Sequence, residues 1–409
     1  MNFVFVSNYI NHHQIPFCNA MVQETDGNFT FIQTEPMEQE RVLMGWHEEI
    51  RPSYVKCYYE EEAVCRERID SADVVLFGGT DDEHYIEKRL KDGKLVVRYS
   101  ERLYKDGQWK AISPRGLYRK YQDHTRYRHS NVYLLCSGAY VPSDFHIVRA
   151  YPCKMYAWGY FPETKYMDID KLMSDKSQEK ETVRILWAAR MIDWKHPELA
   201  VQSAGYLKKA GLDFHLTMVG DGILREEIQA MIAGEGLEDC VSLTGAIRPE
   251  EVRLRMEQAD IFLFTSDRKE GWGAVLNESM NSGCAVVADH MIGATPWLVQ
   301  HGINGFAYED GNSQSLFELT KKLVEDRELR HRMGRAAYDA ITKVWNAESA
   351  AKNLMQLVRG WMEDAARDDG GGIPGRINAT GNMDDLYPGA PAPVISERKM
   401  LKNIYKKRE

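Results

Sequence analysis

The chain has 409 residues, 44% of them hydrophobic and 28% charged, a composition typical of a globular protein with two or three domains. Its formal net charge of −9 argues against a protein dedicated to nucleic acid, because such proteins carry a basic surface. No apolar run is long enough for a membrane-spanning helix, and the seven cysteines form no CxxC pair, so an integral membrane protein, a disulfide framework and a zinc site are not expected.

In the first half, short apolar runs alternate with helical patterns. The chain begins at once with a strand pattern and lacks the basic start of a signal peptide, so we expect a cytoplasmic protein. The expected strands are 3–6, 29–33, 74–77, 95–99 and 132–136, and the expected helices are 13–23, 60–70, 83–91, 115–128 and 142–150.

The second half shows the same alternation more clearly. The expected strands are 184–189, 214–219, 241–244, 261–264 and 285–288, and the expected helices are 197–210, 224–233, 250–258, 274–282, 315–324 and 329–341. Strands alternating with helices predict βαβ units, and their uninterrupted apolar runs predict parallel strands buried on both faces.

These patterns predict an α/β protein with two Rossmann-like, doubly wound parallel-sheet domains. We expect an N-terminal domain over 1–160, a linker over 161–181 and a C-terminal domain over 182–345. A crossover helix would follow over 346–365, and the Gly- and Pro-rich segment 366–409 is predicted to be a flexible tail.

Two carboxylates flank a glycine-rich corner between a buried strand and a helix. Glu270 precedes the run Gly271, Trp272 and Gly273, and Glu278 lies one turn into the following helix. Open α/β sheets bind ligands at such corners, and the helix N-terminus offers free N–H groups to an anion. Acidic acceptors beside a phosphate-binding helix end suit a ligand with both hydroxyls and phosphates, such as a nucleotide-sugar.

This corner resembles the E-x7-E signature of retaining GT-B glycosyltransferases, in particular family 4 (glycosyl transferases group 1). The segment from Arg184 to Arg190, with Lys195, is similar to that family's strand followed by R-x4-K. Further similar elements, in the family's order, are FHLTMVGDG at 214–222, the loop at 293–296 and GINGF at 302–306. The resemblance spans roughly residues 180–350 and implies two Rossmann-like domains facing each other across a cleft.

The resemblance implies roles for the matching residues. Arg190 and Lys195 would bind the diphosphate, whose growing charge preorganised cations stabilise as the glycosidic bond breaks. Glu278 would bind the ribose hydroxyls and Glu270 the transferred sugar. Gly271, Trp272 and Gly273 would bring backbone N–H groups close to the sugar and phosphate, and Leu276 would contribute its backbone alone. The side chain of Trp272 is expected to pack rather than to act in catalysis.

The base of the nucleotide would lie along the next strand ends. Gly222 belongs to a tight turn after a strand, and Ile247 and Arg248 follow the next strand, where they could frame a base. An ordinary loop is an equally good interpretation of these residues.

The first half departs from the family pattern. The loop after the first strand lacks the family's glycines and carries His12 and His13, which either donate hydrogen bonds to the donor or simply begin a helix. No His follows strand 95–99, where the family often has one, and Glu101 is our candidate to contact the sugar or assist the acceptor hydroxyl.

Residues 98–128 form a basic segment with nine Lys or Arg and three Asp or Glu, interleaved with Tyr and Trp. It could contact an anionic membrane at its inner face or a lipid-diphosphate acceptor. A solvated, salt-bridged surface is the alternative interpretation, which we rank slightly higher.

We expect no metal and no resident cofactor. Asp168-Ile169-Asp170 spells DxD, a metal motif of another glycosyltransferase fold, but it lies in the expected linker and we attribute it to chance. The donor is expected to be a nucleotide-sugar, with UDP as the expected nucleotide.

The expected function is therefore retaining transfer of a hexose-type sugar to a glycan or glycolipid in cell-surface polysaccharide synthesis. Alternatives are another GT-B enzyme, such as a sugar phosphorylase or nucleotide-sugar epimerase, and a non-catalytic, degenerate transferase that scaffolds an assembly complex. A dehydrogenase is disfavoured because no GxGxxG follows the first strand.

Overall fold

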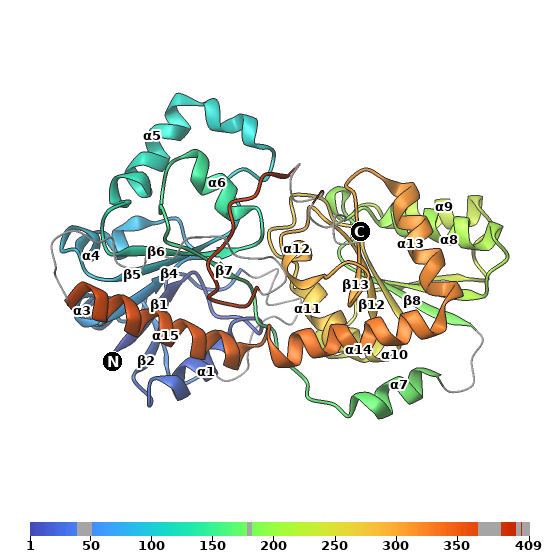
Figure 1. The fold of residues 1–409 in the computed structure, drawn as a ribbon, viewed down its shortest axis with the longest axis horizontal. Helices are drawn as coiled ribbons and strands as arrows, with labels where there is room; N and C mark the ends of the chain where they lie inside the picture. The colour runs from blue at the N-terminus through green and yellow to red at the C-terminus, as the bar shows by residue number, and fades with distance from the viewer. Residues whose placement is uncertain (39–50, 178–181, 367–385, 398–401, 403–409) are drawn as a thin grey trace. The chain divides into compact units, whose positions relative to one another are not determined.

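A computed structural model describes residues 1–38, 51–177, 182–366, 386–397 and 402. The described chain divides into two compact units. Of the described residues, the first unit contains those within 1–163 and 345–396, and the second contains those within 164–344 together with 397 and 402. Each unit holds one parallel sheet with helices around it (Figure 1). The predicted fold class, two doubly wound α/β domains, is confirmed.

The first domain is built on a seven-stranded sheet in the order β3-β2-β1-β4-β5-β6-β7, in which neighbouring strands pair in parallel. The strands are β1 (Phe3–Ser7), β2 (Phe29–Gln33), β3 (Val55–Cys57), β4 (Val74–Phe77), β5 (Val96–Ser100), β6 (Val132–Ser137) and β7 (Met155–Trp158). Strands β3 and β7 were not predicted, because three- and four-residue runs carry little periodic signal.

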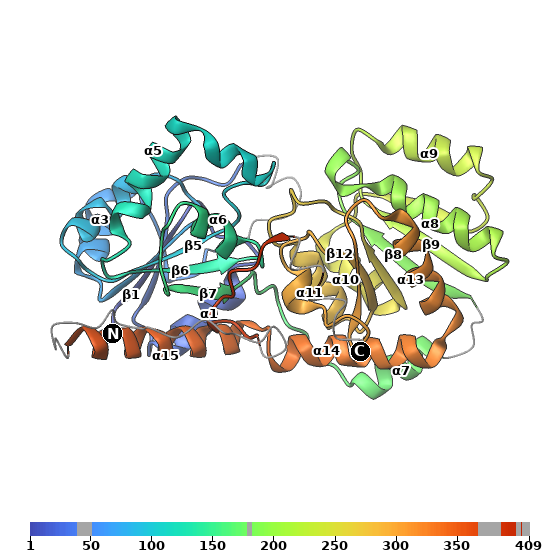
Figure 2. The same ribbon diagram turned by 45° about the horizontal axis from the view of Figure 1, so that its top comes forward.

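Six α-helices lie in the described part of the first domain. They are α1 (Ile15–Glu24), α3 (Glu62–Ser71), α4 (Glu87–Lys91), α5 (Pro114–Asp123), α6 (Val141–Ile147) and α15 (Ala347–Ala366). Helices α15 and α1 lie side by side in both views (Figures 1 and 2). The Trp361 ring of α15 stacks on Tyr133 with centroids 3.8 Å apart, which fixes α15 against this sheet.

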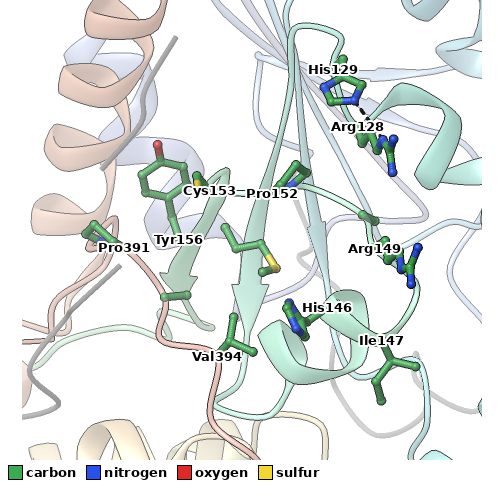
Figure 3. A pocket seen from close by; sticks show the side chains of 13 residues that line it. Arg128, His129, His146, Ile147, Arg149, Pro152, Cys153, Tyr156, Pro391 and Val394 are labelled. Atoms are coloured by element: carbon green, nitrogen blue, oxygen red, sulfur yellow. Dashed lines mark hydrogen bonds between the residues drawn. The ribbon is translucent and has the colours of Figure 1, made fainter. Parts of the chain in front are cut away.

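Residues 386–396 differ from the expected flexible tail, because they lie along the edge strand β7. Ala157 N donates to Ala390 O at 2.7 Å and Ala392 N donates to Met155 O at 2.9 Å. Pro391 accordingly lies beside Tyr156 (Figure 3). A Pro- and Gly-rich composition predicts no strand, but the unpaired backbone groups of an edge strand provide partners that the local sequence does not reveal.

The second domain is built on a six-stranded parallel sheet in the order β10-β9-β8-β11-β12-β13. The strands are β8 (Val183–Ala188), β9 (Phe214–Val219), β10 (Val241–Gly245), β11 (Ile261–Phe264), β12 (Ala285–Asp289) and β13 (Gly305–Tyr308). The strands β8, β11 and β12 are almost wholly buried, as expected for central strands covered on both faces.

Helices surround this second sheet, which lies in the yellow and green part of the ribbon (Figure 2). They are α7 (Ile169–Ser177), α8 (Pro197–Lys209), α9 (Arg225–Gly234), α10 (Pro249–Gln258), α11 (Ala274–Asn281), α12 (Thr295–Leu298), α13 (Ser313–Glu325) and α14 (Arg327–Lys343). Pro197 opens α8 at the first helical position, where its missing N–H costs nothing.

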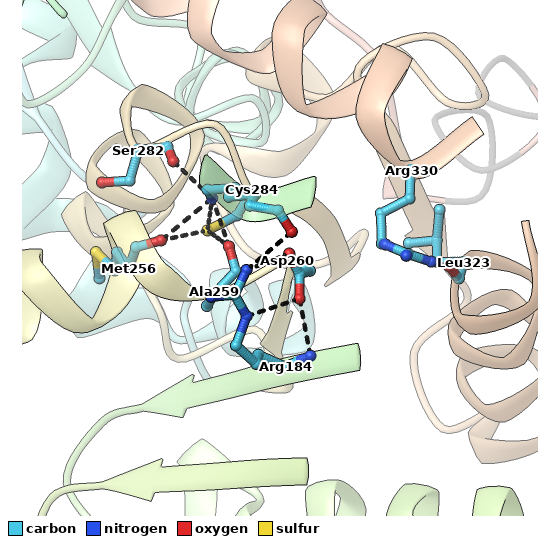
Figure 4. A network of polar contacts seen from close by, with 9 residues as sticks. Arg184, Met256, Ala259, Asp260, Ser282, Cys284, Leu323 and Arg330 are labelled. Atoms are coloured by element: carbon cyan, nitrogen blue, oxygen red, sulfur yellow. Dashed lines mark hydrogen bonds and ion pairs between the residues drawn. The ribbon is translucent and has the colours of Figure 1, made fainter. Parts of the chain in front are cut away.

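Helix α7 replaces part of the expected linker. Lys176 near its end donates to the carbonyl oxygens of Ala259 and Ser282, the latter at 2.9 Å, and so reaches the C-termini of α10 and α11. Beside it, Arg184 and Asp260 form an ion pair at 2.9 Å (Figure 4). The polar sequence after Asp168 hid this helix, because its attachment combines one long side chain, Lys176, with a small apolar contact in which the buried Met173 packs against Gly283 and Gly334.

Candidate functional site

The candidate site lies at the carboxyl edge of the second sheet. Strands β8 and β11 are neighbours and run parallel, so the loops that follow them meet at this edge. Lys195 ends the short 3₁₀ helix η4 (Asp193–Lys195) after β8, and its carbonyl accepts a 2.7 Å hydrogen bond from Thr265 Oγ1, just after β11. This bond joins the two loops that carry the predicted donor-binding residues.

Lys195 and Glu270 form an ion pair. The side chains are 12% and 13% exposed, respectively. The Lys195 ammonium also lies 4.1 Å from the centroid of the Trp194 ring, a cation–π contact. Two residues 75 positions apart in the chain, one expected to bind phosphate and the other sugar, are thus brought into direct contact.

The glycine-rich corner requires small residues. Gly273 has φ +92°, and a Cβ there would lie 2.6 Å from the Phe264 ring. It caps α11, whose first N–H groups are left for other acceptors. Gly271 is buried. The corner is held by backbone bonds from Gly293 N to Glu270 O (3.3 Å) and from Ala294 N to Trp272 O (3.1 Å).

Trp272 and Leu276 are both part of the core. Trp272 is 1% exposed and its indole N–H donates to Asn277 Oδ1 at 2.9 Å, while Leu276 is fully buried. Their side chains therefore support the corner, and only their backbone groups are available to a ligand.

Glu278 lies on α11 and is half-buried. Burial raises the pKa of its carboxyl, and the positive charges of Arg253 and Lys165 oppose that shift. Among the residues that the structure describes, no side chain hydrogen-bonds this carboxylate, whereas its backbone oxygen accepts from Arg253 at 2.9 Å. The carboxylate is thus available as an acceptor for ligand hydroxyls.

Arg190 follows β8 and is exposed. Within the described ranges no carboxylate pairs with its guanidinium, in contrast to Lys195. The structure therefore places Arg190 on the same loop as Lys195 without a direct contact to the two glutamates.

A cluster that the sequence analysis missed surrounds His196. The imidazole lies 2.7 Å from a Glu198 oxygen and 3.6 Å from Asp267 Oδ2, and Asp267 and Glu198 together raise the pKa of His196 to about 10. Asp267 N in turn donates to Trp194 O at 3.0 Å. The sequence signal that could have revealed this cluster was Asp267, a carboxylate that lies shortly after the end of β11 and three residues before Glu270.

Gly222, Ile247 and Arg248 lie at the same sheet edge but further from the corner, since β9 and β10 lie on the other side of β8. A Cβ on Gly222 would lie 2.4 Å from Met191 O, so the turn packs directly on the loop that follows Arg190. Arg248 is exposed and pairs with Glu251 at 2.9 Å at the start of α10.

The two candidate residues of the first domain, His13 and Glu101, both lie at its carboxyl edge. Tyr160 OH donates to Glu101 Oε1 at 2.6 Å, and Glu101 also pairs with Lys105. His13 and Tyr160 line one small pocket together with Gln14 and Tyr99. Tyr160 thus contacts Glu101 and also lines the pocket that contains His13, an arrangement that the sequence analysis did not predict.

The basic segment 98–128 divides into buried and exposed parts. Arg98 pairs with Glu83 at 2.6 Å and Arg102 with Asp144 at 3.3 Å, and both arginines are buried, so these two cations have structural partners. On and before α5, by contrast, large apolar side chains are exposed: Trp109, Ile112, Leu117, Tyr118 and Tyr121.

The DxD sequence has a local explanation. Asp168 Oδ1 accepts from the backbone N–H groups of Asp170 and Lys171 at 3.0 Å each, as a helix cap does, and Asp170 pairs with Arg335. In the described part of the chain there is no group of three or more His, Cys, Asp or Glu side chains that could hold a metal ion. No described helix has the length and apolarity to cross a bilayer.

Comparison with known proteins finds a family match within the second domain. Residues 168–340 match the family model of glycosyl transferases group 1. The chain is 33% identical over 150 residues to the amylovoran biosynthesis glycosyltransferase AmsK of Erwinia amylovora, over 36% of this chain and 37% of that protein. It is 32% identical over 175 residues to a Campylobacter jejuni N-acetylgalactosaminyltransferase named for a diphospho-undecaprenol acceptor, over 42% and 46%. The matches span less than half the length of these two curated relatives.

Solved structures are similar over most of the chain. Anabaena HepE in complex with UDP and glucose superposes with a TM-score of 0.60 at 14% identity, covering 88% of this chain and 99% of that one. WaaG, a glycosyltransferase of lipopolysaccharide biosynthesis, superposes with a TM-score of 0.58 at 14% identity, covering 88% and 100%. The two-sheet architecture is therefore the GT-B fold, and residues 168–340 of its second domain are similar to glycosyl transferases group 1.

Proposed function

We propose that the chain is a retaining glycosyltransferase that moves a hexose-type sugar from a UDP-sugar to a hydroxyl of a glycan or lipid-linked acceptor. The observation that carries the proposal is the Lys195–Glu270 pair beside the N-terminus of α11, with the Glu278 carboxylate on the same helix. The names of the relatives and the UDP bound to HepE support the reaction class and the nucleotide.

The ion pair suggests how a donor is accommodated. A diphosphate, with two or more negative charges, competes with Glu270 for the Lys195 ammonium, and Arg190 on the same loop adds a second cation. Glu270, released from Lys195, then accepts hydrogen bonds from sugar hydroxyls. Donor binding would thus exchange one internal ion pair for two ligand contacts, so that the Lys195 ammonium keeps an anionic partner and the Glu270 carboxylate keeps hydrogen-bond donors.

The same groups would act in the reaction. As the bond between the sugar and the diphosphate breaks, negative charge grows on the leaving phosphate, and Arg190, Lys195 and the α11 N-terminus stabilise it. Glu278 would hold the ribose and so fix the position of the diphosphate. In this scheme the chain's own cations do the electrostatic work, and no metal is invoked.

The test is UDP release from a panel of UDP-hexoses by the purified chain, with and without acceptor sugars. Replacing Glu270, Arg190 or Lys195 singly with Ala is expected to lower turnover by about 100-fold, the effect of removing one preorganised charge. Lys209→Ala, an exposed lysine on α8, is the matched control and keeps its activity. Unchanged turnover in all three variants would contradict the proposal, and dependence on free phosphate would identify a phosphorylase instead.

A further inference from the structure

The first domain carries a second pocket, of about 740 Å³, at the amino ends of β6 and β7 (Figure 3). Parallel strands place His13 and Glu101 at the opposite, carboxyl edge of this sheet, so this pocket is separate from the residues discussed above. Its walls come from the segment before β6, the end of α6, the segment before β7 and residues 391–394.

The charged part of the lining is entirely basic. Arg128, His129, His146 and Arg149 line the pocket, all four are exposed, and no lining residue is acidic. Arg128 Nε donates to His129 Nε2 at 3.0 Å, which orients the two side chains together. Two permanent positive charges and two imidazoles at one opening, in a chain with a net charge of −9, favour an anionic ligand.

The rest of the lining is apolar. It includes Ile147, Pro152, Met155, Pro391 and Val394, of which Ile147 and Val394 are 40% and 42% exposed. Tyr156 and Pro391 lie on the side of the pocket opposite Arg128 and Arg149 (Figure 3). A ligand that fills this pocket therefore meets cations together with Ile147 on one side and an apolar wall that includes Pro391 on the other (Figure 3), which suits an anionic amphiphile.

The backbone at the rim is strained. Arg149, Tyr151 and Cys153 have φ of 55°, 48° and 58°, conformations that non-glycine residues rarely adopt. The segment is held by Lys154, whose buried ammonium donates to Ser130 O at 2.6 Å and so ties it to the loop of Arg128. Strain of this kind persists where the surrounding structure enforces it, and it concentrates at ligand sites.

We propose that this pocket binds the phosphate headgroup of an anionic phospholipid, with the first carbons of an acyl chain against Ile147, Pro391 and Val394. Arg128 and Arg149 hold the phosphate oxygens, and the imidazoles add hydrogen bonds. The site is distinct from the exposed aromatic surface around α5 and does not depend on the proposed reaction.

The pocket contains its own probe. Cys153 lines it and is the one exposed cysteine of the seven in the chain, all of which the structure describes. The rate at which Cys153 reacts with a thiol reagent such as DTNB therefore reports whether the pocket is occupied, and Cys153→Ser removes the signal. At a lipid concentration ten times the Kd, the reaction is expected to slow by about tenfold.

The experiment compares dihexanoyl phosphatidylglycerol with dihexanoyl phosphatidylcholine and with inorganic phosphate. Only the first is expected to protect Cys153. Arg128→Gln and Arg149→Asn, the latter keeping a residue that tolerates positive φ, should each weaken protection by about tenfold. Arg115→Gln, which removes an exposed cation of α5 outside the pocket, should leave it unchanged.

Each other outcome overturns the proposal. Equal protection by phosphatidylcholine would show that charge is not recognised, and equal protection by phosphate would show that the apolar wall is not used. If Arg115→Gln weakened protection as much as Arg128→Gln and Arg149→Asn do, the lipid would be attracted by the general positive charge of this surface and not by the pocket. A Cys153 that does not react with DTNB in the free chain would contradict an open pocket. The lipid series uses the unmodified chain, so it remains decisive even if a variant fails to fold.

Discussion

At the scale of single residues, the ion pair of Lys195 and Glu270 is the feature on which the donor site depends. Both side chains are largely withdrawn from water, and each supplies the compensating charge for the other. Removing one partner leaves a nearly buried charge without compensation, which costs more than removing both. The two residues should therefore behave as one unit in the protein without ligand.

A double-mutant cycle measures this coupling. Lys195→Met and Glu270→Gln should each lower the free energy of unfolding, and the double variant should lose less than the sum of the two. The expected coupling is about 1–3 kcal/mol, from urea unfolding of the two single variants and the double variant. If the losses in unfolding free energy were strictly additive, the two side chains would not be energetically coupled, and the ion pair would make no net contribution to stability.

His196 provides a test by pH. Asp267 and Glu198 raise its pKa to about 10, so the folded chain holds a proton that the unfolded chain releases near its usual value of about 6.5. The resulting stabilisation is complete below pH 6.5 and is lost as the pH rises towards 10. Unfolding midpoints of the wild type and His196→Asn, compared between about pH 6 and pH 10, should converge as the pH rises.

The Asn variant keeps the backbone conformation, because His196 has φ 49° and Asn tolerates that region. A difference between the two midpoints that stays constant with pH would mean that the imidazole is not the titrating group.

At the scale of elements, the corner between β11 and α11 was predictable because its signals are local. A buried apolar run, glycines at a tight turn and a helical pattern follow one another along a short stretch of chain, and Gly273 indeed needs a left-handed backbone. The assignment of roles to Glu270, Glu278, Arg190 and Lys195 stays a prediction until variants are measured.

Elements defined by distant partners could not be predicted. Strand β13 is four residues long and begins at a glycine, and its identity comes from pairing with β12. Residues 386–396 are fixed by bonds to β7, and helix α7 by contacts to α10 and α11. The hydrogen bond from Tyr160 to Glu101 likewise joins two separate loops that no local pattern relates.

The attachment of α7 can be measured. Lys176→Met removes the ammonium that donates to Ala259 O and Ser282 O and leaves those carbonyls without this donor. We expect a loss of about 1–3 kcal/mol in the free energy of unfolding. Lys171→Met changes an exposed lysine on the same helix and serves as the control. Equal urea midpoints for the two variants would refute this role for Lys176.

At the scale of the whole molecule, the two domains contribute unequally to the functional assignment. The second domain carries the family match, and its candidate residues lie on one sheet edge. The first domain departs from the family pattern in sequence, although solved GT-B structures cover both sheets. The donor class therefore has more support than the acceptor, whose binding residues must be sought around Glu101, Tyr160 and the exposed surface of α5.

The central claim is that the second domain binds the diphosphate of UDP through Lys195. Titration calorimetry of UDP against the wild type, Lys195→Ala and the exposed-lysine control Lys209→Ala tests it directly. We predict that Lys195→Ala weakens the affinity by about tenfold to a hundredfold, while Lys209→Ala binds as the wild type does. Equal affinities for wild type and Lys195→Ala, or no UDP binding by the wild type, would contradict it.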